Sequence, residues 1–333
     1  MPAAKTSQLE STSSIALPKM GCGTWAWGNR LLWDYTEAMN KDLEQVFIHC
    51  VRHGVTLFDT GDSYGTGKLS GQSEKLLGQF KTDYEGPNKD RICLATKLAP
   101  YPWRLTQQSI VMAGEASAQR LRGLDLVQLH WSTANYFSPQ EGPLLDGLAR
   151  LCKSGNAKGL GLSNFGPKRL RWAHKRLTQQ GVKILTLQVQ YSLLSTYPVT
   201  QLGLKEVCDE LGIQLIAYSP LALGLLTGKY TQKSDLPKGL RRFALGQILP
   251  GATPLLNVLK EVAEEREKTM AQVAINWCIC KGAIPIPGAK NISQARQNTG
   301  ALGWHLTTAE IDELDSASAA CDKQMIQNIF QSR

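Results

Sequence analysis

Strand-like and helix-like segments alternate eight times along this chain of 333 residues. Because parallel strands need long crossover connections, which are usually helical, this alternation is typical of a parallel sheet covered by helices. Eight such units predict a closed (β/α)8 TIM barrel, an α/β fold. The predicted strands are Lys19–Gly23, Val55–Phe58, Ile92–Thr96, Leu126–Leu129, Lys158–Gly161, Ile184–Gln188, Gln214–Tyr218 and Ala283–Pro287.

The segments between these strands carry apolar residues at helical spacing. Two connections, Gly61–Gly71 and Ser219–Ala252, are longer than usual, and long loops in compact domains tend to be functional. No Ser-, Gly- or Pro-rich linker divides the chain, so we expect one domain over residues 17–333 after a flexible extension over residues 1–16. The expected helices are Asp42–His53, Gln72–Phe80, Thr106–Arg122, Pro143–Ser154, Pro167–Thr178, Pro198–Leu211 and Thr253–Lys281.

The chain is basic, with 37 Lys and Arg against 28 Asp and Glu and a net charge of +9. A basic surface can attract nucleic acid, acidic lipid or a phosphorylated ligand. The densest groups, Lys168–Arg171 with Lys175 and Arg176, and Arg241 with Arg242, contain no run of five like charges. We therefore expect solvated surfaces there and no nucleic-acid partner. No apolar run approaches the ~18 residues of a membrane-spanning helix, so no membrane partner is expected.

The eight cysteines are well separated and mostly flanked by apolar residues. Residues 1–17 are polar and rich in Ser and Thr, without the apolar stretch of a signal peptide. This combination predicts reduced thiols in a cytoplasmic protein. No metal site is expected. The pair Cys278 and Cys280 has no second pair to complete a zinc site, and no Glu follows His49 to make a zinc-binding motif with His53.

Four titratable residues lie where a barrel places catalytic groups, at the C-terminal ends of its strands. Asp59, Lys97 and His130 directly follow the second, third and fourth predicted strands, and Tyr64 lies five residues past Asp59. Each alone has a structural explanation: Asp59 could cap a helix, Lys97 could be solvated and His130 could be a satisfied core histidine. Four together on one rim favour a catalytic site.

The chemistry of these four side chains suits delivery of a proton to a carbonyl group that receives a hydride. The pKa of tyrosine, near ~10, is too high for efficient acid–base chemistry at neutral pH. A nearby ammonium group favours the phenolate and lowers that pKa, and a carboxylate fixes the ammonium group in place. A neutral imidazole can donate a hydrogen bond to the carbonyl oxygen.

A series of short motifs surrounds these residues along the chain. They are Phe58-Asp59-Thr60-Gly61-Asp62-Ser63-Tyr64-Gly65, Ala95-Thr96-Lys97, Gln128-Leu129-His130-Trp131, Gly161-Leu162-Ser163-Asn164-Phe165, Leu187-Gln188-Val189-Gln190-Tyr191, Ala217-Tyr218-Ser219-Pro220-Leu221 and Ile286-Pro287-Gly288-Ala289. In this order, from about Leu17 to Leu314, the sequence resembles the aldo-keto reductase family. The resemblance implies a (β/α)8 barrel that binds an extended NADP(H) without a Rossmann fold. It also implies a catalytic tetrad of Asp59, Tyr64, Lys97 and His130 in which Tyr64 is the acid.

Further positions match residues that hold the cofactor in that family. They are Gly23, Thr24, Trp25, Ser163, Asn164, Gln188, Tyr218, Ser219, Leu221, Gly224, Gly288, Lys290, Gln294 and Asn298. By resemblance, Tyr218 stacks on the nicotinamide ring, whereas Ser163, Asn164 and Gln188 hold its carboxamide. The loop that begins at Ser219 closes over the pyrophosphate.

The adenosine end departs from the best-known pattern of the family. Positions that often read Lys-Ser with a later Arg are Gly288-Ala289 and Gln294 here. Another branch has a similar Gly-Ala-(Lys/Arg) sequence, so the resemblance still implies NADP(H), with Lys290 on the 2′-phosphate. Trp25 and Trp131 follow the first and fourth strands, and we expect them to wall an aromatic substrate pocket.

We therefore expect an NADP(H)-dependent oxidoreductase that reduces small aldehydes or ketones to alcohols, as a monomer or weak homo-oligomer. Two alternatives are a cofactor-bound redox-sensing regulatory subunit that resembles potassium-channel β-subunits, and a barrel without activity. Two rival motifs are disfavoured. Gly21, Gly23 and Ala26 have the spacing of a dinucleotide-binding fingerprint, but the residues that follow are a poor helix start. Tyr64 and Lys68 have the spacing of the Tyr-x-x-x-Lys pair of short-chain dehydrogenases, but two glycines between them oppose the helical turn that this pair needs.

Overall fold

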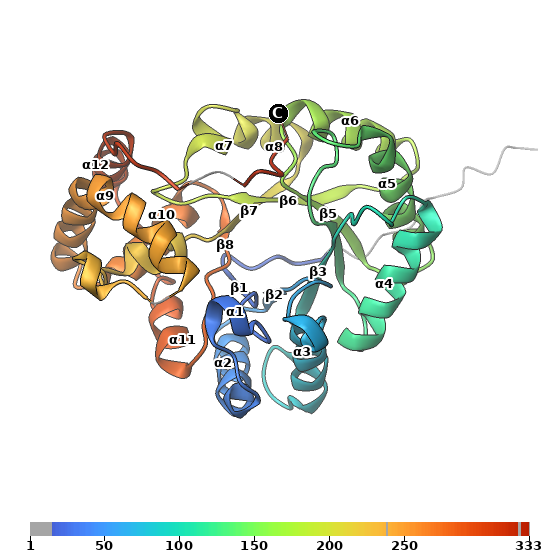
Figure 1. Ribbon diagram of the computed structural model, residues 1–333, viewed down its shortest axis with the longest axis horizontal. Coiled ribbons are helices and arrows are strands. Elements are labelled where there is room, and N and C mark those ends of the chain that lie inside the picture. The colour runs from blue at the N-terminus through green and yellow to red at the C-terminus, as the bar shows by residue number, and fades with distance from the viewer. Residues whose placement is uncertain (1–14, 238, 326–327, 333) are drawn as a thin grey trace, which may run out of the picture.

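The computed structural model describes residues 15–237, 239–325 and 328–332. Within these residues, the strands pair in parallel and in chain order, and a bridge between Gly23 and Gly288 joins the two ends of the sheet. Figure 1 shows the resulting ring of strands. The strands are β1 (Gly21–Gly23), β2 (Leu57–Asp59), β3 (Cys93–Leu98), β4 (Leu126–Leu129), β5 (Gly159–Ser163), β6 (Ile184–Gln190), β7 (Gln214–Tyr218) and β8 (Ile284–Pro285).

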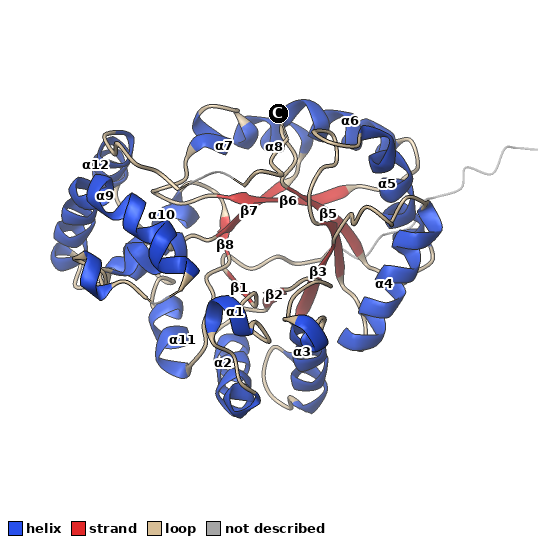
Figure 2. Cartoon of the chain, in the orientation of Figure 1, coloured by secondary structure: helices blue, strands red, loops and turns tan. Residues whose placement is uncertain are grey.

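Helices surround this ring (Figure 2), so the predicted (β/α)8 barrel is confirmed. The helices are α1 (Arg30–Trp33), α2 (Asn40–Arg52), α3 (Gln72–Asp83), α4 (Gln107–Leu121), α5 (Ser138–Lys153), α6 (Pro167–Thr178), α7 (Tyr197–Thr200), α8 (Leu204–Leu211), α9 (Leu240–Glu265), α10 (Met270–Cys280), α11 (Ile292–Thr299) and α12 (Thr308–Ala319). Short 3-10 turns lie between them, among them η4 (Ala222–Thr227) after β7.

The inside of the barrel changes from apolar to polar along the strands. Alternate residues of a strand face the same side, so Leu57 and Asp59 both point inward from β2. One end is filled by a buried apolar cluster of Leu57, Cys93, Ala95, Leu126, Ile216, Ile284 and Ile286. Towards the C-terminal ends of the strands, the inward positions carry buried Asp59, Lys97, Gln128 and Gln188 instead. The fold therefore brings the polar residues of several strands together at one end.

The expected strands are all present, and β4 and β7 have their predicted bounds. Strand β3 runs further than expected, through Lys97 to Leu98, because these residues pair in register with Gln128 and Leu129 of β4. Lys97 therefore lies within its strand rather than after it, and Asp59 is the last residue of β2.

The largest differences from the predicted helix bounds concern three helices. Helix α5 begins at Ser138 instead of Pro143. The sequence does not indicate its first turn because two of the buried residues there, Gln140 and Glu141, are polar and interrupt the apolar spacing. The helix predicted over 198–211 divides into α7 and α8 at Gly203, whose φ of 64° is left-handed. The helix predicted over 253–281 divides into α9 and α10, since Thr269 caps a new helix by accepting a hydrogen bond from the Gln272 amide. The supposed loop up to Ala252 contains the start of α9.

The predicted extension over residues 1–16 lies outside the described residues except for Ile15 and Ala16. Ile15 and Leu17 pack against the apolar cluster at the closed end of the barrel. All eight cysteines are free thiols. None of the helices in the described ranges is long and apolar enough to cross a bilayer.

Candidate active site

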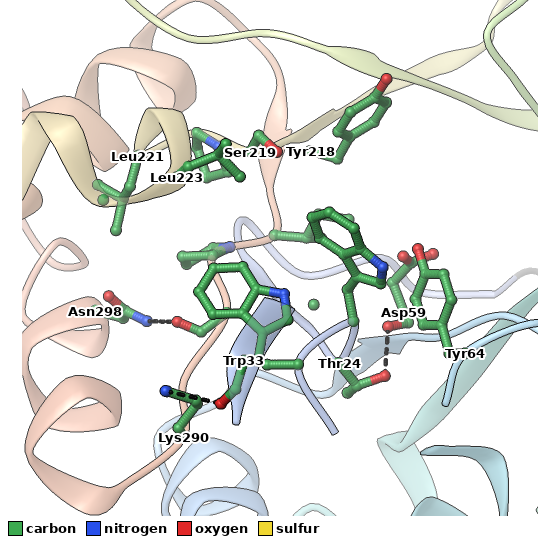
Figure 3. A pocket seen from close by; sticks show the side chains of 18 of the residues that line it. Thr24, Trp33, Asp59, Tyr64, Tyr218, Ser219, Leu221, Leu223, Lys290 and Asn298 are labelled. Atoms are coloured by element: carbon green, nitrogen blue, oxygen red, sulfur yellow. Dashed lines mark hydrogen bonds between the residues drawn. The ribbon is translucent and has the colours of Figure 1, made fainter. Parts of the chain in front are cut away.

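A cavity of about 680 Å³ opens over the C-terminal ends of the strands. All residues predicted for catalysis and cofactor binding line it, as does Trp25, whereas Trp131 lies outside this lining. Figure 3 shows that Asp59 and Tyr64 lie at one end of the cavity, with Lys290 and Asn298 at the other. The structure thus brings together residues from β1 to β8 that are far apart in the sequence.

Asp59 and Lys97 form a buried ion pair at the floor of the cavity. Their side chains are 3% and 1% exposed, and Lys97 Nζ donates to Asp59 Oδ1. The second oxygen, Oδ2, accepts from Gln128 Nε2 at 3.0 Å and from Gln188 Nε2 at 2.8 Å. Three donors therefore fix the carboxylate, and the carboxylate fixes the ammonium group. Burial lowers the pKa of Lys97, and the charge of Asp59 opposes that shift.

Tyr64 stands next to this ion pair. Lys97 Nζ lies 5.0 Å from the centre of the Tyr64 ring. Burial raises the pKa of the Tyr64 phenol well above its usual value, and the carboxylates of Asp59 and Asp62 raise it further. Asp59 neutralises part of the Lys97 charge, so the expected lowering of this pKa by the lysine does not outweigh burial and the two carboxylates. The phenol remains protonated at neutral pH, which is the form that a proton donor needs.

His130 faces Tyr64 from the end of β4, with 5.9 Å between the ring centres. Burial lowers the pKa of His130 well below its usual value, and the nearby Lys97 charge acts in the same direction. Nδ1 of the ring is buried and has no hydrogen-bond partner among the described residues. The imidazole is therefore neutral at pH 7 and able to act as a hydrogen-bond donor, as the sequence predicts.

The residues predicted to hold the nicotinamide gather on β5, β6 and β7. Asn164 follows β5 with a left-handed φ of 59°, a conformation that Asn tolerates better than most residues. Its Nδ2 donates to Ser163 Oγ at 3.1 Å, and its Oδ1 accepts from Tyr218 Oη at 3.0 Å. Gln188 uses its amide nitrogen on Asp59. Only its carbonyl oxygen is left to accept a hydrogen bond from a carboxamide.

The loop after β7 has an unusual backbone. Ser219, Ala222 and Leu223 have positive φ angles of 52°, 48° and 56°. Such angles are strained for residues other than Gly and persist where the surroundings hold them, often at ligand sites. Ser219 and Leu223 both line the cavity, together with Leu221 and Gly224. This loop is the one predicted to cover the pyrophosphate.

Three cations line the end of the cavity away from Tyr64. The sequence predicts Lys290 there, but neither Lys229 nor Arg241. The Arg241 guanidinium lies 4.2 Å from the centre of the Trp33 ring, and Lys290 Nζ donates to Trp33 O at 3.3 Å. None of the three cations forms an ion pair within the described part of the chain, where Arg241 Nε also lacks a hydrogen-bond partner although it is buried. This end of the cavity is suited to an anion.

The places of Trp33 and Arg241 have little signature in the sequence. Arg241 is expected in a solvated basic pair with Arg242, yet it packs on Trp33 from the start of α9. The one sequence feature that could have indicated Arg241 is its position as a basic residue after the long loop that follows β7. Burial, together with the charges of Arg241 and Lys229, lowers the pKa of Lys290.

The two tryptophans predicted to wall the substrate pocket occupy different places. Trp25 lines the cavity and is 39% exposed. Trp131 lies one layer further out, where its ring stacks on Phe330 with 4.5 Å between centres and donates from Nε1 to Tyr136 Oη at 2.7 Å. Its neighbour His130 carries the contact with the cavity, so Trp131 supports the rim rather than the lining.

Comparison with known proteins agrees with this geometry. The model of the Aldo/keto reductase family matches residues 19–319. The chain belongs to the aldo/keto reductase family. The predicted family membership and oxidoreductase class are thereby confirmed.

One relative is the chloroplastic pyridoxal reductase of Arabidopsis thaliana, 51% identical over 96% of this chain and 88% of the relative. An aldo-keto reductase from Klebsiella pneumoniae, solved in complex with NADPH, is 25% identical with a TM-score of 0.70 over 94% of this chain and 95% of its own. A glycerol dehydrogenase from Gluconobacter oxydans shares the fold, with a TM-score of 0.77 at 23% identity over 97% and 100% of the two chains.

The comparison corrects one prediction. The absence of an apolar leader predicts a cytoplasmic protein, but the Arabidopsis relative, similar over nearly its whole length, is chloroplastic. Transit peptides are amphipathic and rich in Arg and Ser, without the apolar core of a signal peptide, so the search for an apolar stretch does not test for one.

Proposed function

We propose that this reductase reduces an aromatic aldehyde to its alcohol with NADPH, with Tyr64 as the proton donor. The observation that carries the proposal is the position of the Tyr64 phenol beside the Asp59–Lys97 pair and opposite His130. The similarity to a pyridoxal reductase favours pyridoxal, a heteroaromatic aldehyde, as the substrate. The exposed Trp25 ring at the mouth provides a flat apolar wall for such a ring.

The cavity fits NADPH by its own chemistry. Gly23 lines the cavity without a side chain, so its backbone is accessible there. A larger residue would not fit, because an added Cβ would lie 2.8 Å from Ile286 O. The three cations Lys229, Arg241 and Lys290 suit phosphate groups, and Lys290 would hold the 2′-phosphate. The cofactor seen in complex with the Klebsiella relative supports this assignment. When bound, NADPH supplies the hydride.

The residues of this chain would handle the proton and the carbonyl oxygen. His130, neutral at pH 7, donates a hydrogen bond to the carbonyl oxygen and orients it. Tyr64 donates its phenol proton to the same oxygen as negative charge develops there. Lys97, held by Asp59, stabilises the phenolate that remains. Burial of the whole group excludes water and strengthens each of these interactions.

A turnover assay tests this proposal. Purified protein should oxidise NADPH in the presence of pyridoxal with sustained steady-state turnover, and Tyr64→Phe should reduce turnover by about 10²–10⁴-fold. NADPH affinity should change less than about twofold in the variant, because the phenol does not hold the cofactor. Tight NADPH binding with very slow turnover across a carbonyl panel would instead favour the redox-sensing subunit. Activity of Tyr64→Phe within threefold of the parent would remove Tyr64 from the acid role.

We further propose that the protein acts in plastids, as its Arabidopsis relative does by name. Imaging of a fusion that carries a fluorescent protein at the C-terminus in plant cells tests this location. Signal that coincides with chlorophyll fluorescence is expected, and diffuse cytosolic signal would contradict it.

A further inference from the structure

The segment Asn328–Ser332 returns over the cavity from the C-terminal end of the chain. The amide of Ser332 donates to Asn164 O at 3.1 Å, and its hydroxyl accepts from the Gly166 amide at 2.9 Å. Between them, the Phe330 ring stacks on Trp131 at an interplanar angle of 18°. The segment is thus held at the ends of β4 and β5, beside His130 and Asn164.

Within this segment, Asn328 is the residue that lines the cavity. Its Nδ2 donates to Tyr218 Oη at 2.9 Å. Its Oδ1 accepts from the Phe330 amide at 2.9 Å, which fixes the orientation of the side-chain amide. Only the NH₂ group of Asn328 can therefore face the Tyr218 phenol.

The hydrogen bonds continue in one direction from Asn328 to the catalytic end. Tyr218 Oη accepts from Asn328 and donates to Asn164 Oδ1 at 3.0 Å. Asn164 Nδ2 then donates to His130 O at 3.1 Å. Each amide in the chain has its oxygen and nitrogen committed, so neither can turn over without the loss of two hydrogen bonds. The chain connects the C-terminal segment with the residues assigned to nicotinamide and carbonyl binding.

We propose that Asn328 is a positioning residue for hydride transfer, acting through Tyr218. This inference rests on the proposed function, in which Tyr218 stacks on the nicotinamide. Asn328 fixes the phenol oxygen of Tyr218 and with it the plane of the ring. A small misplacement of bound reactants costs a large factor in rate, so this restraint affects catalysis more than binding. The restraint on Tyr218 comes from the hydrogen bond of Asn328, which belongs to a segment outside the barrel.

The test compares Asn328→Ala and Asn328→Asp with Ile329→Ala as the matched control. Ile329 belongs to the same segment, but its side chain is 79% exposed. Loss of one hydrogen bond should lower kcat with pyridoxal about three- to tenfold in Asn328→Ala. Asn328→Asp should lose as much, because a carboxylate can only accept and would take the hydrogen bond that Tyr218 Oη donates to Asn164. NADPH affinity and the melting temperature should stay near those of the parent, and Ile329→Ala should match the parent throughout.

Two readouts separate positioning from a general structural effect. With NADPH deuterated at the transferred position, the isotope effect on kcat should be larger in Asn328→Ala than in the parent, because hydride transfer becomes slower. Tyr218→Phe removes the hydroxyl that accepts from Asn328, so adding Asn328→Ala to this variant should cause no further loss of kcat.

The inference is overturned if Asn328→Ala keeps kcat and the isotope effect of the parent, or if the losses of the two substitutions multiply in the double variant. The parent is measured in the same assay. A parent without NADPH-dependent turnover would contradict the proposed function itself. A parent that turns over normally, with equally active Asn328 variants, contradicts this inference alone.

Discussion

At the scale of single residues, the site depends on how charge is distributed around one phenol. Lys97 forms an ion pair with Asp59 and thereby neutralises much of the negative charge that Asp59 would otherwise place beside Tyr64. Burial then keeps the phenol protonated. This state suits the proposed reduction, in which Tyr64 gives up a proton, whereas oxidation of an alcohol would need the phenolate.

Replacement of Lys97 by Met should therefore move the pH dependence of alcohol oxidation to higher pH. In the parent, the raised pKa of Tyr64 already makes the oxidation rate rise with pH, because more phenolate forms. Without the ammonium group, Asp59 and Asp62 raise that pKa further. At pH 8 we expect oxidation to fall about tenfold or more, because less phenolate is available to accept the proton. Lys97→Arg, which keeps the charge, should move the profile less. An unchanged profile in Lys97→Met would contradict the coupling.

Gly61 leaves the space that the Tyr64 ring occupies. An added Cβ would lie 3.1 Å from two carbons of that ring, closer than an ordinary contact, so the ring would have to move a few tenths of an ångström. We expect Gly61→Ala to lower kcat about three- to tenfold while NADPH affinity stays constant. Gly246→Ala serves as the control, since its new methyl group makes an ordinary contact of 3.5 Å with Leu236. Equal kcat in the parent and Gly61→Ala would show that the ring tolerates the displacement.

At the scale of secondary-structure elements, helix α6 carries two arginines in contrasting surroundings. Arg169 reaches the fully buried carboxylate of Glu141 at 2.5 Å, and that carboxylate also accepts from the Thr133 amide at 2.8 Å. Arg171 pairs with Glu210, where both side chains are about half exposed. The first pair ties α5 and α6 to the loop that follows His130, whereas the second lies in solvent.

Arg169→Met should lower the free energy of unfolding by about 3 kcal/mol, because it leaves a buried carboxylate without its counter-charge. Arg171→Met on the same helix should change it by less than about 0.5 kcal/mol, as is usual for an exposed pair. Urea denaturation of the two variants measures both values. Similar values for the two variants would contradict the importance of burial here.

An element can be predicted from the sequence where its pattern of apolar residues is clear and has clear boundaries. The strands are recognisable because their buried apolar runs are short and bounded by glycines or helices. The start of α9 is missed because Gly246, Pro250 and Pro254 interrupt the pattern there, although the helix continues through them. The clustering of the four predicted catalytic residues in one cavity is recognisable because strand ends fix their positions. Asn328 is missed because its proposed role depends on a tertiary contact with Tyr218 that no local sequence pattern records.

At the scale of the whole molecule, the cavity is lined by residues from opposite sides of the barrel, so a bound cofactor should stabilise the fold as a unit. NADPH at one hundred times its Kd should add about 2.7 kcal/mol to the free energy of unfolding and raise the melting temperature. Lys290→Ala should weaken NADPH about tenfold and shrink this rise, whereas NADH affinity should barely change. Titration of both cofactors by tryptophan fluorescence checks this. Equal weakening of NADPH and NADH would remove Lys290 from the 2′-phosphate.

The two ends of the described chain lie at opposite ends of the barrel. Ile15 packs at the closed end, beside Gly159, whereas Ser332 is bonded to Asn164 at the mouth of the cavity. A bulky group attached next to Ser332 therefore lies within reach of the substrate entrance and competes with the docking of Phe330. Kinetic constants from C-terminally tagged preparations will describe the tag as well as the enzyme.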